Sequence, residues 1–337
     1  MPLPGEGMAT IIKNFDGPYY LVIAKSFYNP KIISTLFSFD LGPIYYAAHF
    51  PLYSIFIKIF SFGIGSLWSM LFVPLIFSVL AAVVFYFFLK EFNYSQSPLW
   101  LTLIFLLFPA RWLIVRSVGS PEPLFMFCLI ASFYFFKKEN FWLAGIFGGL
   151  CQLTKPPGIL LFLAYAIYLF WKKKSQLLRA LPLLIIPLAL LGIFGYYRSI
   201  YGDFFAYFHS GDNIHLFWPP LQIFNAASNW VGTFWLEEII YVYLLGILGV
   251  ILLFKQKHDD LAIFAAVFFA TTLFISHRDL SRYSLPMVPF LLIAFESFLA
   301  KKEFKIAFSI ILLPIFLYAI NFIAGNTLGI ADWTPFL

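Results

Sequence analysis

The sequence predicts an all-α protein, a polytopic bundle of transmembrane helices, and two observations support that prediction. Of its 337 residues, 62% are hydrophobic and 11% are charged, with a mean hydropathy of +0.88, whereas a water-soluble domain carries roughly a quarter charged residues. The hydrophobic residues form long runs, and lysines fall in short clusters between them, as in chains that cross a bilayer repeatedly. The pI near 9.1 therefore reflects membrane topology rather than a nucleic-acid partner.

About ten apolar segments are the expected spans, and together they form one domain. Several are shorter than the ~20 residues of a straight span. The short ones are interrupted by proline or glycine, as at Pro109, Pro156, Pro157 and Pro182. We therefore expect broken or oblique helices that line a cavity. The segments are 67–89, 98–115, 123–136, 141–154, 159–171, 180–198, 236–254, 261–276, 284–299 and 306–324.

The basic residues predict the orientation of the bundle. One set of alternate connections is rich in lysine, and the positive-inside rule makes that set cytoplasmic: Lys90, Lys137, Lys138, Lys172, Lys173, Lys174, Arg179, Lys255, Lys257, Lys301, Lys302 and Lys305. The opposite set holds carboxylates, cations and four of the five histidines. We therefore expect an integral, multi-pass membrane protein, in the plasma (inner) membrane of a prokaryote, with its active site on the extracytoplasmic face.

This orientation places residues 1–66 outside, as a first outer loop with helical stretches. Residues 67–324 then form the transmembrane bundle, and residues 325–337 form an outer tail. Within the loop, the stretch from His49 to Phe62 has a lysine in its middle. It is typical of a helix lying in the interface, or of the outer end of the first span. Either a further transmembrane helix before Met1 carries the loop across the bilayer, or the loop is translocated as a short N-terminal tail, and we favour the further helix.

The outer loops place carboxylates, imidazoles and cations beside the bilayer, which favours group transfer from a lipid-phosphate donor. A carboxylate can be the base for an acceptor hydroxyl, and Arg, Lys and His can hold the departing phosphate. Aromatic side chains, 22% of the chain, suit isoprenoid tails and sugar faces. Asp16 is the candidate base, although its place before Gly17 and Pro18 also suits a helix N-cap. Asp40 has an equally ordinary alternative in a turn.

Several stretches along the chain follow the motifs of one family in order. They are FDGPYYLVIA at 15–24 with FPLY at 50–53, SPEPLF at 120–125, WLAG at 142–145 with LTKPPG at 153–158, YGDFFAYFH at 201–209 and RYSLPMVP at 282–289. The family patterns are W-D-x-x-W-Y-x-x-I-A with F-F-P-L-Y-P, T-E-S-L-F, W-L-A-G with L-T-R-P-x-G, F-G-D-P-L-A-F-x-H and R-Y-L-L-P-L-F-P. Together these stretches resemble the PIG-V-like mannosyltransferases over most of the chain.

The resemblance implies the GT-C fold, a multi-helix membrane glycosyltransferase whose active site lies on the outer or luminal side. It implies transfer of a hexose, mannose or a similar sugar, from a polyprenyl-phosphate donor to a hydroxyl of a lipid, glycan or protein acceptor. The carboxylate of the first outer loop is the base that the family leads us to expect, which is Asp16. The chain departs from the family pattern at Phe15, Lys155 and His49, where the family has Trp, Arg and an aromatic residue. These departures bear on the sugar and the acceptor more than on the reaction class.

The candidate phosphate ligands are cationic or hydrogen-bonding residues of the later outer loops. Arg282 and Tyr283, with His277 and Arg278 nearby, form the best cluster for the donor phosphate, with a solvated loop as the ordinary alternative. Lys155 at a helix break is a second phosphate ligand or a snorkelling lysine.

The supporting or substrate-binding candidates are Asp40, His49, Glu122 and His209. Glu122 equally suits the start of a helix, and His49 equally suits an interfacial position with no chemical role. His209, together with His215, lies in the long loop 199–235 and is a candidate for the entrance of the acceptor.

We expect no cofactor and no metal, although the shared face of carboxylates and histidines leaves a metal site open. No H-x-x-x-H or D-x-D spacing is present, and a lipid monophosphate has no diphosphate for a divalent ion to bridge. The alternative function is a membrane transporter or lipid flippase, which would place ionisable residues near mid-span and show inverted repeats. Here the charges lie at outer helix ends and no repeat is visible. A non-catalytic membrane scaffold is a third possibility.

Overall fold

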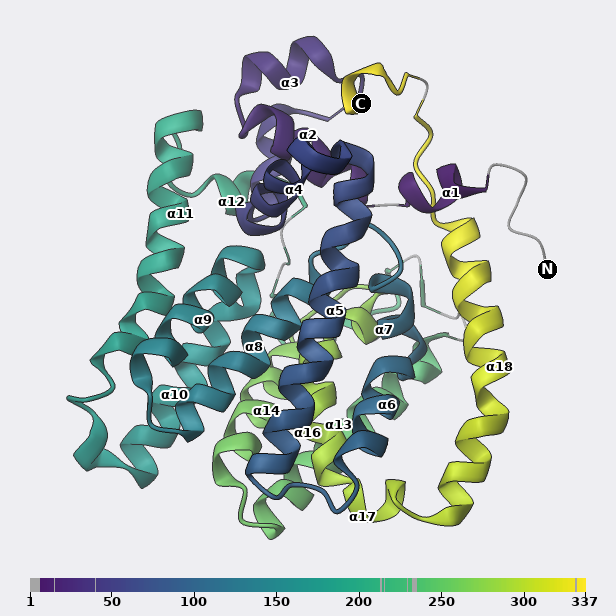
Figure 1. The fold of residues 1–337 in the computed structure, drawn as a ribbon. Helices are drawn as coiled ribbons and strands as arrows, with labels where there is room; N and C mark the ends of the chain where they lie inside the picture. Colours follow the sequence, from purple (N-terminus) through teal and green to yellow (C-terminus); the bar gives the residue numbers. More distant parts are fainter. Residues whose placement is uncertain are drawn as a thin grey trace.

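The computed structural model describes residues 7–14, 16–39, 41–212, 214, 216–228, 230–231, 235–330 and 332–337. It is 75% helix (Figure 1). The described residues form no β-strand, only isolated bridges between Asn14 and Thr327 and between Leu216 and Ile275. The expected fold class, an all-helical membrane protein, is confirmed.

Most helices follow one another along the chain with short connections, and the long connection lies between α12 and α13. The α-helices are α1 (Met8–Ile12), α2 (Gly17–Ser26), α3 (Pro30–Leu36), α4 (Pro51–Ile64), α5 (Ser66–Glu91), α6 (Pro98–Leu107), α7 (Ala110–Val115), α8 (Glu122–Lys137), α9 (Phe141–Thr154), α10 (Ile159–Lys172), α11 (Ile185–Tyr201), α12 (Ala206–His209), α13 (Trp235–Lys255), α14 (Asp259–Thr272), α15 (Leu280–Tyr283), α16 (Val288–Ala294), α17 (Glu296–Leu299) and α18 (Lys302–Gly325). The 3-10 helices are η1 (Pro43–Ala48), η2 (Pro156–Gly158), η3 (Lys174–Gln176), η4 (Leu181–Leu184), η5 (Gln222–Phe224), η6 (Leu285–Met287) and η7 (Thr334–Phe336).

Among the described residues, four helices are long and apolar enough to cross a membrane in one piece. They are α5, the stretch Leu181–Tyr201, the stretch Leu236–Lys255 and α18. Other apolar helices are shorter, and two of the interruptions fall at predicted prolines. The segment 98–115 is divided into α6 and α7 at Pro109, and α9 and α10 are separated at Pro156 and Pro157. Proline causes such breaks because it lacks a backbone N–H and disfavours helical backbone in the residue before it.

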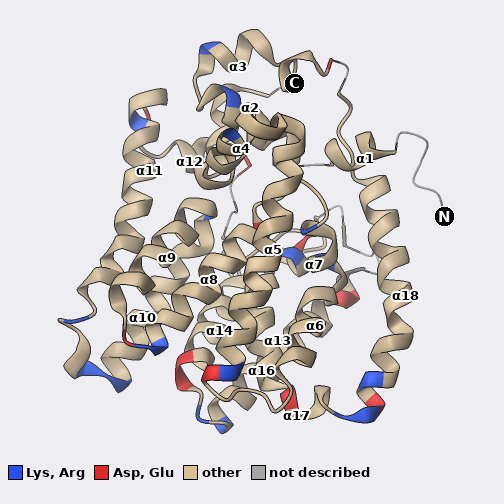
Figure 2. Cartoon of the chain, in the orientation of Figure 1, with Lys and Arg blue, Asp and Glu red and all other residues tan. Residues whose placement is uncertain are grey.

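The lysine-rich connections gather at one end of the bundle, the lower end in Figure 2. Two of them are tied to the start of α14, where Lys137 lies 2.8 Å from Asp260 and Lys172 lies 2.9 Å from Asp259. These acidic residues lie in the first turn of α14, where the helix dipole also favours negative charge. Ion pairs therefore hold these lysine-bearing helix ends to α14 at the lower end of the bundle.

The N-terminal segment and the C-terminal tail lie together at the opposite end of the bundle (Figure 1). The backbone N–H of Leu328 donates to the carbonyl of Lys13 at 2.8 Å, and the rings of Phe37 and Phe336 meet edge to face at 5.2 Å. The first and last described parts of the chain are thus held against each other, above the membrane-length helices.

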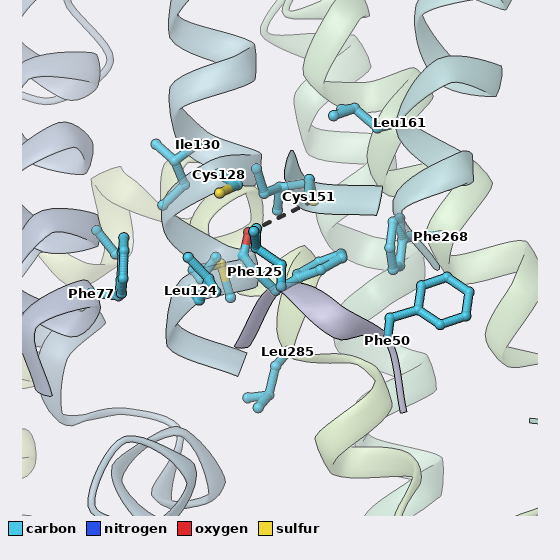
Figure 3. Close-up of a cluster of buried hydrophobic side chains, with 14 of the residues drawn as sticks. Phe50, Phe77, Leu124, Phe125, Cys128, Ile130, Cys151, Leu161, Phe268 and Leu285 are labelled. Carbon is cyan, nitrogen blue, oxygen red and sulfur yellow. Dashed lines mark hydrogen bonds between the residues drawn. The ribbon is translucent and has the colours of Figure 1, made fainter. Parts of the chain in front are cut away.

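The core of the bundle surrounds α8, which is buried between α5 and α9. Figure 3 shows part of this core, where the sulfur of Cys151 lies 3.7 Å from the carbonyl oxygen of Phe125. Cys128 and Cys151 are both free and buried. Close packing of this kind is what holds helices together in lipid, where burial of apolar surface gives little driving force. It fixes the upper helix ends, from which the candidate site is built.

Candidate active site

A polar cavity of about 490 Å³ lies at the end of the bundle that carries the N-terminal segment. Its wall comes from segments far apart in the sequence, including the start of α2, the end of η1, α7, the break between α9 and α10, the loop after α12, and α15. Both signs of charge lie on it: Arg111, Lys155, Arg278 and Arg282 with Asp16, Asp212, Glu238 and Asp279. Charged groups gathered in one cavity of a membrane bundle mark a candidate functional site.

Asp16 enters the cavity wall from the start of α2. It occupies the N-cap position of that helix, but its side chain makes no capping hydrogen bond. Its Oδ2 instead lies 2.5 Å from Nη1 of Arg282. The start of α2 packs closely on the turn before α8, where a Cβ on Gly119 would lie 3.0 Å from the Cα of Gly17. The Asp16 carboxylate therefore pairs with Arg282 at the cavity instead of capping α2.

Glu122 lies behind the cavity wall and holds two cations there. Its side chain is 5% exposed, and its Oε1 lies 2.7 Å from Nζ of Lys155 and 2.6 Å from Nε of Arg282. The hydroxyl of Ser120 also donates to it. A buried carboxylate persists only when it is paired, so Glu122 fixes both cations at the wall. Arg282 thus bridges two carboxylates, Glu122 and Asp16.

A second ion pair joins Arg111 of α7 to Asp279. The Arg111 guanidinium also lies 3.9 Å from the ring centroid of Phe322, a favourable cation–π distance. The backbone N–H of Asp279 donates to Nδ1 of His277 at 3.0 Å, and the His277 ring meets Tyr283 edge to face at 5.3 Å. These contacts hold the segment before α15 in place, with Arg278 on the cavity wall.

Asp212 enters the cavity from the loop after α12. Its Oδ2 lies 3.8 Å from Nε2 of His49, and Tyr45 is another of its close neighbours. Partial burial and the charge of Asp16 raise the pKa of Asp212 to about 6. Burial lowers the pKa of His49 to about 4, although the charge of Asp16 opposes that shift. His49 is therefore neutral near pH 7.

The cavity brings together most of the residues that the sequence marks as site candidates. Seven of them line it: Asp16, His49, Lys155, His277, Arg278, Arg282 and Tyr283. Glu122 lies behind them, bound to two of them. His209 does not line the cavity; its Nδ1 lies 2.6 Å from Asp203, and its side chain is 61% exposed. Asp40 and His215 lie outside the described residues.

Four charged residues of the cavity were not among the site candidates: Arg111, Asp212, Glu238 and Asp279. Arg111 falls inside the apolar segment 98–115, and only the break at Pro109 brings it to the wall at the start of α7. Asp212 shares the long loop with His209 but belongs to no motif. Asp279 stands three residues before Arg282, which is the one local signal that could have marked it.

Within the described part of the chain, no three His, Cys, Asp or Glu side chains are grouped so that they could share a metal ion. Three carboxylates at the cavity are engaged by arginine. Asp16 and Glu122 pair with Arg282, and Asp279 pairs with Arg111. The expectation that no metal is needed stays a prediction.

Residues 48–197 match a family model, that of the dolichyl-phosphate-mannose-protein mannosyltransferases, over less than half of the chain. The match contains His49, Glu122 and Lys155, and it supports a membrane glycosyltransferase of the GT-C type. With the long apolar helices, it indicates an integral membrane protein. The PIG-V-like resemblance stays a prediction, because the matched model is that of a different mannosyltransferase family. No curated protein matches the chain.

Proposed function

We propose that this protein is an inverting GT-C glycosyltransferase that moves a hexose, mannose or a similar sugar, from a polyprenyl phosphate to a hydroxyl on the extracytoplasmic face. The acceptor hydroxyl belongs to a lipid, a glycan or a protein. One observation carries the proposal: Asp16 and Arg282, from opposite ends of the chain, meet in a polar cavity of a membrane protein. A base and a phosphate-binding cation are the two groups that this reaction requires.

Asp16 is the proposed base. Its carboxylate takes the proton of the acceptor hydroxyl while the oxygen attacks the anomeric carbon of the donor sugar. The bond between that carbon and the phosphate oxygen breaks, and the polyprenyl phosphate leaves with the bonding electrons. The phosphate is already a weak base, so it needs cations more than a proton.

The proposed phosphate site is formed by Arg282, Lys155 and Arg278, with His277 beside them. Glu122 anchors the first two of these cations from behind. Arg278 is exposed on the wall and has no ion-pair partner among the residues that the structure describes. It therefore offers a charge that an incoming phosphate can use without breaking an existing pair.

The test of this proposal is an Asp16→Asn substitution in the full chain. Purified wild-type protein is incubated with a panel of polyprenyl-phosphate hexoses and membrane lipids, and released polyprenyl phosphate is measured. We expect release by the wild-type protein and a loss of at least about 100-fold in the variant, the usual size of a lost general base. Thermal unfolding in detergent establishes that the variant is folded.

Asp203→Asn is the matched control, because Asp203 pairs with His209 outside the cavity lining. This control should turn over at the wild-type rate. A folded Asp16→Asn protein that transfers sugar as fast as the wild type would refute the assignment of the base. Uptake of a solute into reconstituted vesicles without any product would favour the transporter instead.

A further inference from the structure

The cavity is not uniform, because its carboxylates have different partners. Asp16 is paired with Arg282, and Asp279 is paired with Arg111. Asp212 has no lysine or arginine within ion-pair distance among the described residues, and its charged or chargeable neighbour is His49 at 3.8 Å. The Asp212 carboxylate is therefore open to hydrogen bonding by a ligand, whereas Asp16 is already occupied.

His49 supports this distinction with a second unused group. Its side chain is 7% exposed and lines the cavity, and its Nε2 faces Asp212 without a hydrogen bond in the described structure. Its Nδ1 is buried, so Nε2 is the ring nitrogen that a ligand can reach. Together with Asp212, it forms a patch of hydrogen-bonding groups that carries no fixed positive charge.

Aromatic rings adjoin this patch. Tyr20, Phe50 and Tyr207 line the same cavity, and the rings of Phe50 and Tyr207 meet edge to face at 5.6 Å. Rings beside a carboxylate and an imidazole suit a polyhydroxylated ligand, whose C–H face packs on the rings while its hydroxyls donate to the oxygens and nitrogens. The patch itself has no fixed positive charge that would bind an anion.

From these contacts we infer that Asp212, with His49, binds the acceptor, and that the acceptor is a carbohydrate or polyol hydroxyl. This inference rests on the proposed function and divides the cavity between two substrates. The cations bind the donor phosphate, and the Asp212 patch orients the acceptor hydroxyl toward Asp16. Asp212 accepts a hydrogen bond and keeps its own charge, so Asp16 remains the group that takes the proton.

The pH dependence follows from the pKa of Asp212, which partial burial raises to about 6. Above that value the carboxylate accepts a hydroxyl hydrogen bond as an anion; below it, protonation weakens the contact. The groups that face Asp212 from every neighbouring element are Tyr45, His49, Asp16, Tyr19, Tyr207, Arg282 and Tyr283. His49 stays neutral down to about pH 4, so its own titration lies below that of Asp212.

The experiment compares the wild type with Asp212→Asn and Asp203→Asn in the full chain. A polyprenyl-phosphate hexose is the donor, and a neutral alkyl glycoside and a serine-containing peptide are the acceptor probes. At pH 7.5 we expect Asp212→Asn to raise the KM for the glycoside about ten-fold or more. The KM for the donor should not change. The decline of kcat/KM for the acceptor below about pH 6 should disappear.

An unchanged acceptor KM in Asp212→Asn, or an equal loss for donor and acceptor, would overturn this inference while leaving the proposed function in place. Glycosylation of the peptide in preference to the glycoside would overturn the assignment of the acceptor class. If the wild type releases no polyprenyl phosphate from any donor, the proposed function fails, and the acceptor site fails with it.

Discussion

His49 combines an aromatic role with a titratable one. Its ring meets Tyr20 edge to face at 5.0 Å and Tyr19 at 5.7 Å, so it packs as the aromatic residue that the resembling family has at this position. It also differs from an aromatic residue, because it can take a proton. Burial lowers its pKa from 6.5 to about 4, and this shift links the stability of the protein to pH.

The stability of the wild type should fall as the pH falls from about 6.5 to about 4. Within this window the unfolded chain binds a proton at His49 and the folded protein does not, so acidification favours unfolding, by up to about 3 kcal/mol. His49→Phe keeps the ring contacts and removes the titration. Unfolding in detergent at pH 7 and pH 4.5 should show a smaller acid-induced loss in the variant. Equal losses in the two proteins would contradict this origin.

The individual residues also show how far the sequence leads. Asp16 and Arg282 could be proposed as base and phosphate ligand because each stands in a recognisable motif, and the ion pair between them brings both motifs to one cavity. Arg111 and Asp212 could not be proposed, since each depends on a local break or loop path that places it. His209 stood in a motif, yet its imidazole turns to Asp203 within its own loop. In each case the contacts made in the folded protein, and not the residue type alone, determine whether the residue lies in the cavity.

At the scale of the element, the short helix α9 depends on glycine. A Cβ on Gly145 would lie 2.3 Å from the carbonyl oxygen of Pro182, and one on Gly148 would lie 2.5 Å from Ile186. The absence of side chains lets α9 approach η4 and α11 closely, as small residues do between membrane helices. The end of α9 leads directly into Lys155, so this packing also fixes the position of Lys155 in the cavity wall.

Gly145→Ala should destabilise the folded protein by about 1–3 kcal/mol, because the added methyl group meets a backbone oxygen that cannot move aside. Gly195→Ala is the matched control. A Cβ at Gly195, in the middle of α11, meets nothing within 4 Å, so the higher helix propensity of alanine should leave stability equal or slightly improved. Thermal unfolding in detergent compares the two variants. A Gly145→Ala protein as stable as the wild type would show that α9 is free to shift.

The positions of the helices along the chain were more predictable than their tilt and their packing partners. The apolar runs and the prolines located the long helices and two of their breaks, because both signals are local. The tilt and the pairing of the short helices were not predictable, since they follow from packing between distant residues. An example is the stacking of Phe136 on Tyr165 with ring centroids 4.0 Å apart. Such a contact has no signature in either segment alone.

At the scale of the whole molecule, the two ends of the bundle differ in kind. One end holds the lysine-rich connections, and the other holds the cavity and both described termini (Figures 1 and 2). The helix α18 connects these ends over 24 residues, a length of about 36 Å at 1.5 Å per residue, which is enough for a bilayer core. The positive-inside rule then predicts that the cavity faces away from the cytoplasm.

Cysteine labelling tests this orientation. The native thiols Cys128 and Cys151 are buried, so an introduced cysteine should be the main reactive one. Lys302→Cys and Gly329→Cys place an exposed thiol at each end of α18. In intact cells, a membrane-impermeant maleimide should label Gly329→Cys and leave Lys302→Cys unlabelled until the cells are opened. Labelling of both from the same side would contradict the crossing by α18.

The sharing of Arg282 has one more consequence, which concerns the lifetime of the donor complex. The donor phosphate and the Asp16 carboxylate compete for the same guanidinium, and by thermodynamic reciprocity each weakens the hold of the other. Removing the charge of Asp16 should therefore leave Arg282 to the phosphate. The Asp16→Asn protein should therefore turn over slowly and also retain its lipid-linked sugar. It is the variant best suited to an experimental structure with the donor bound in the cavity.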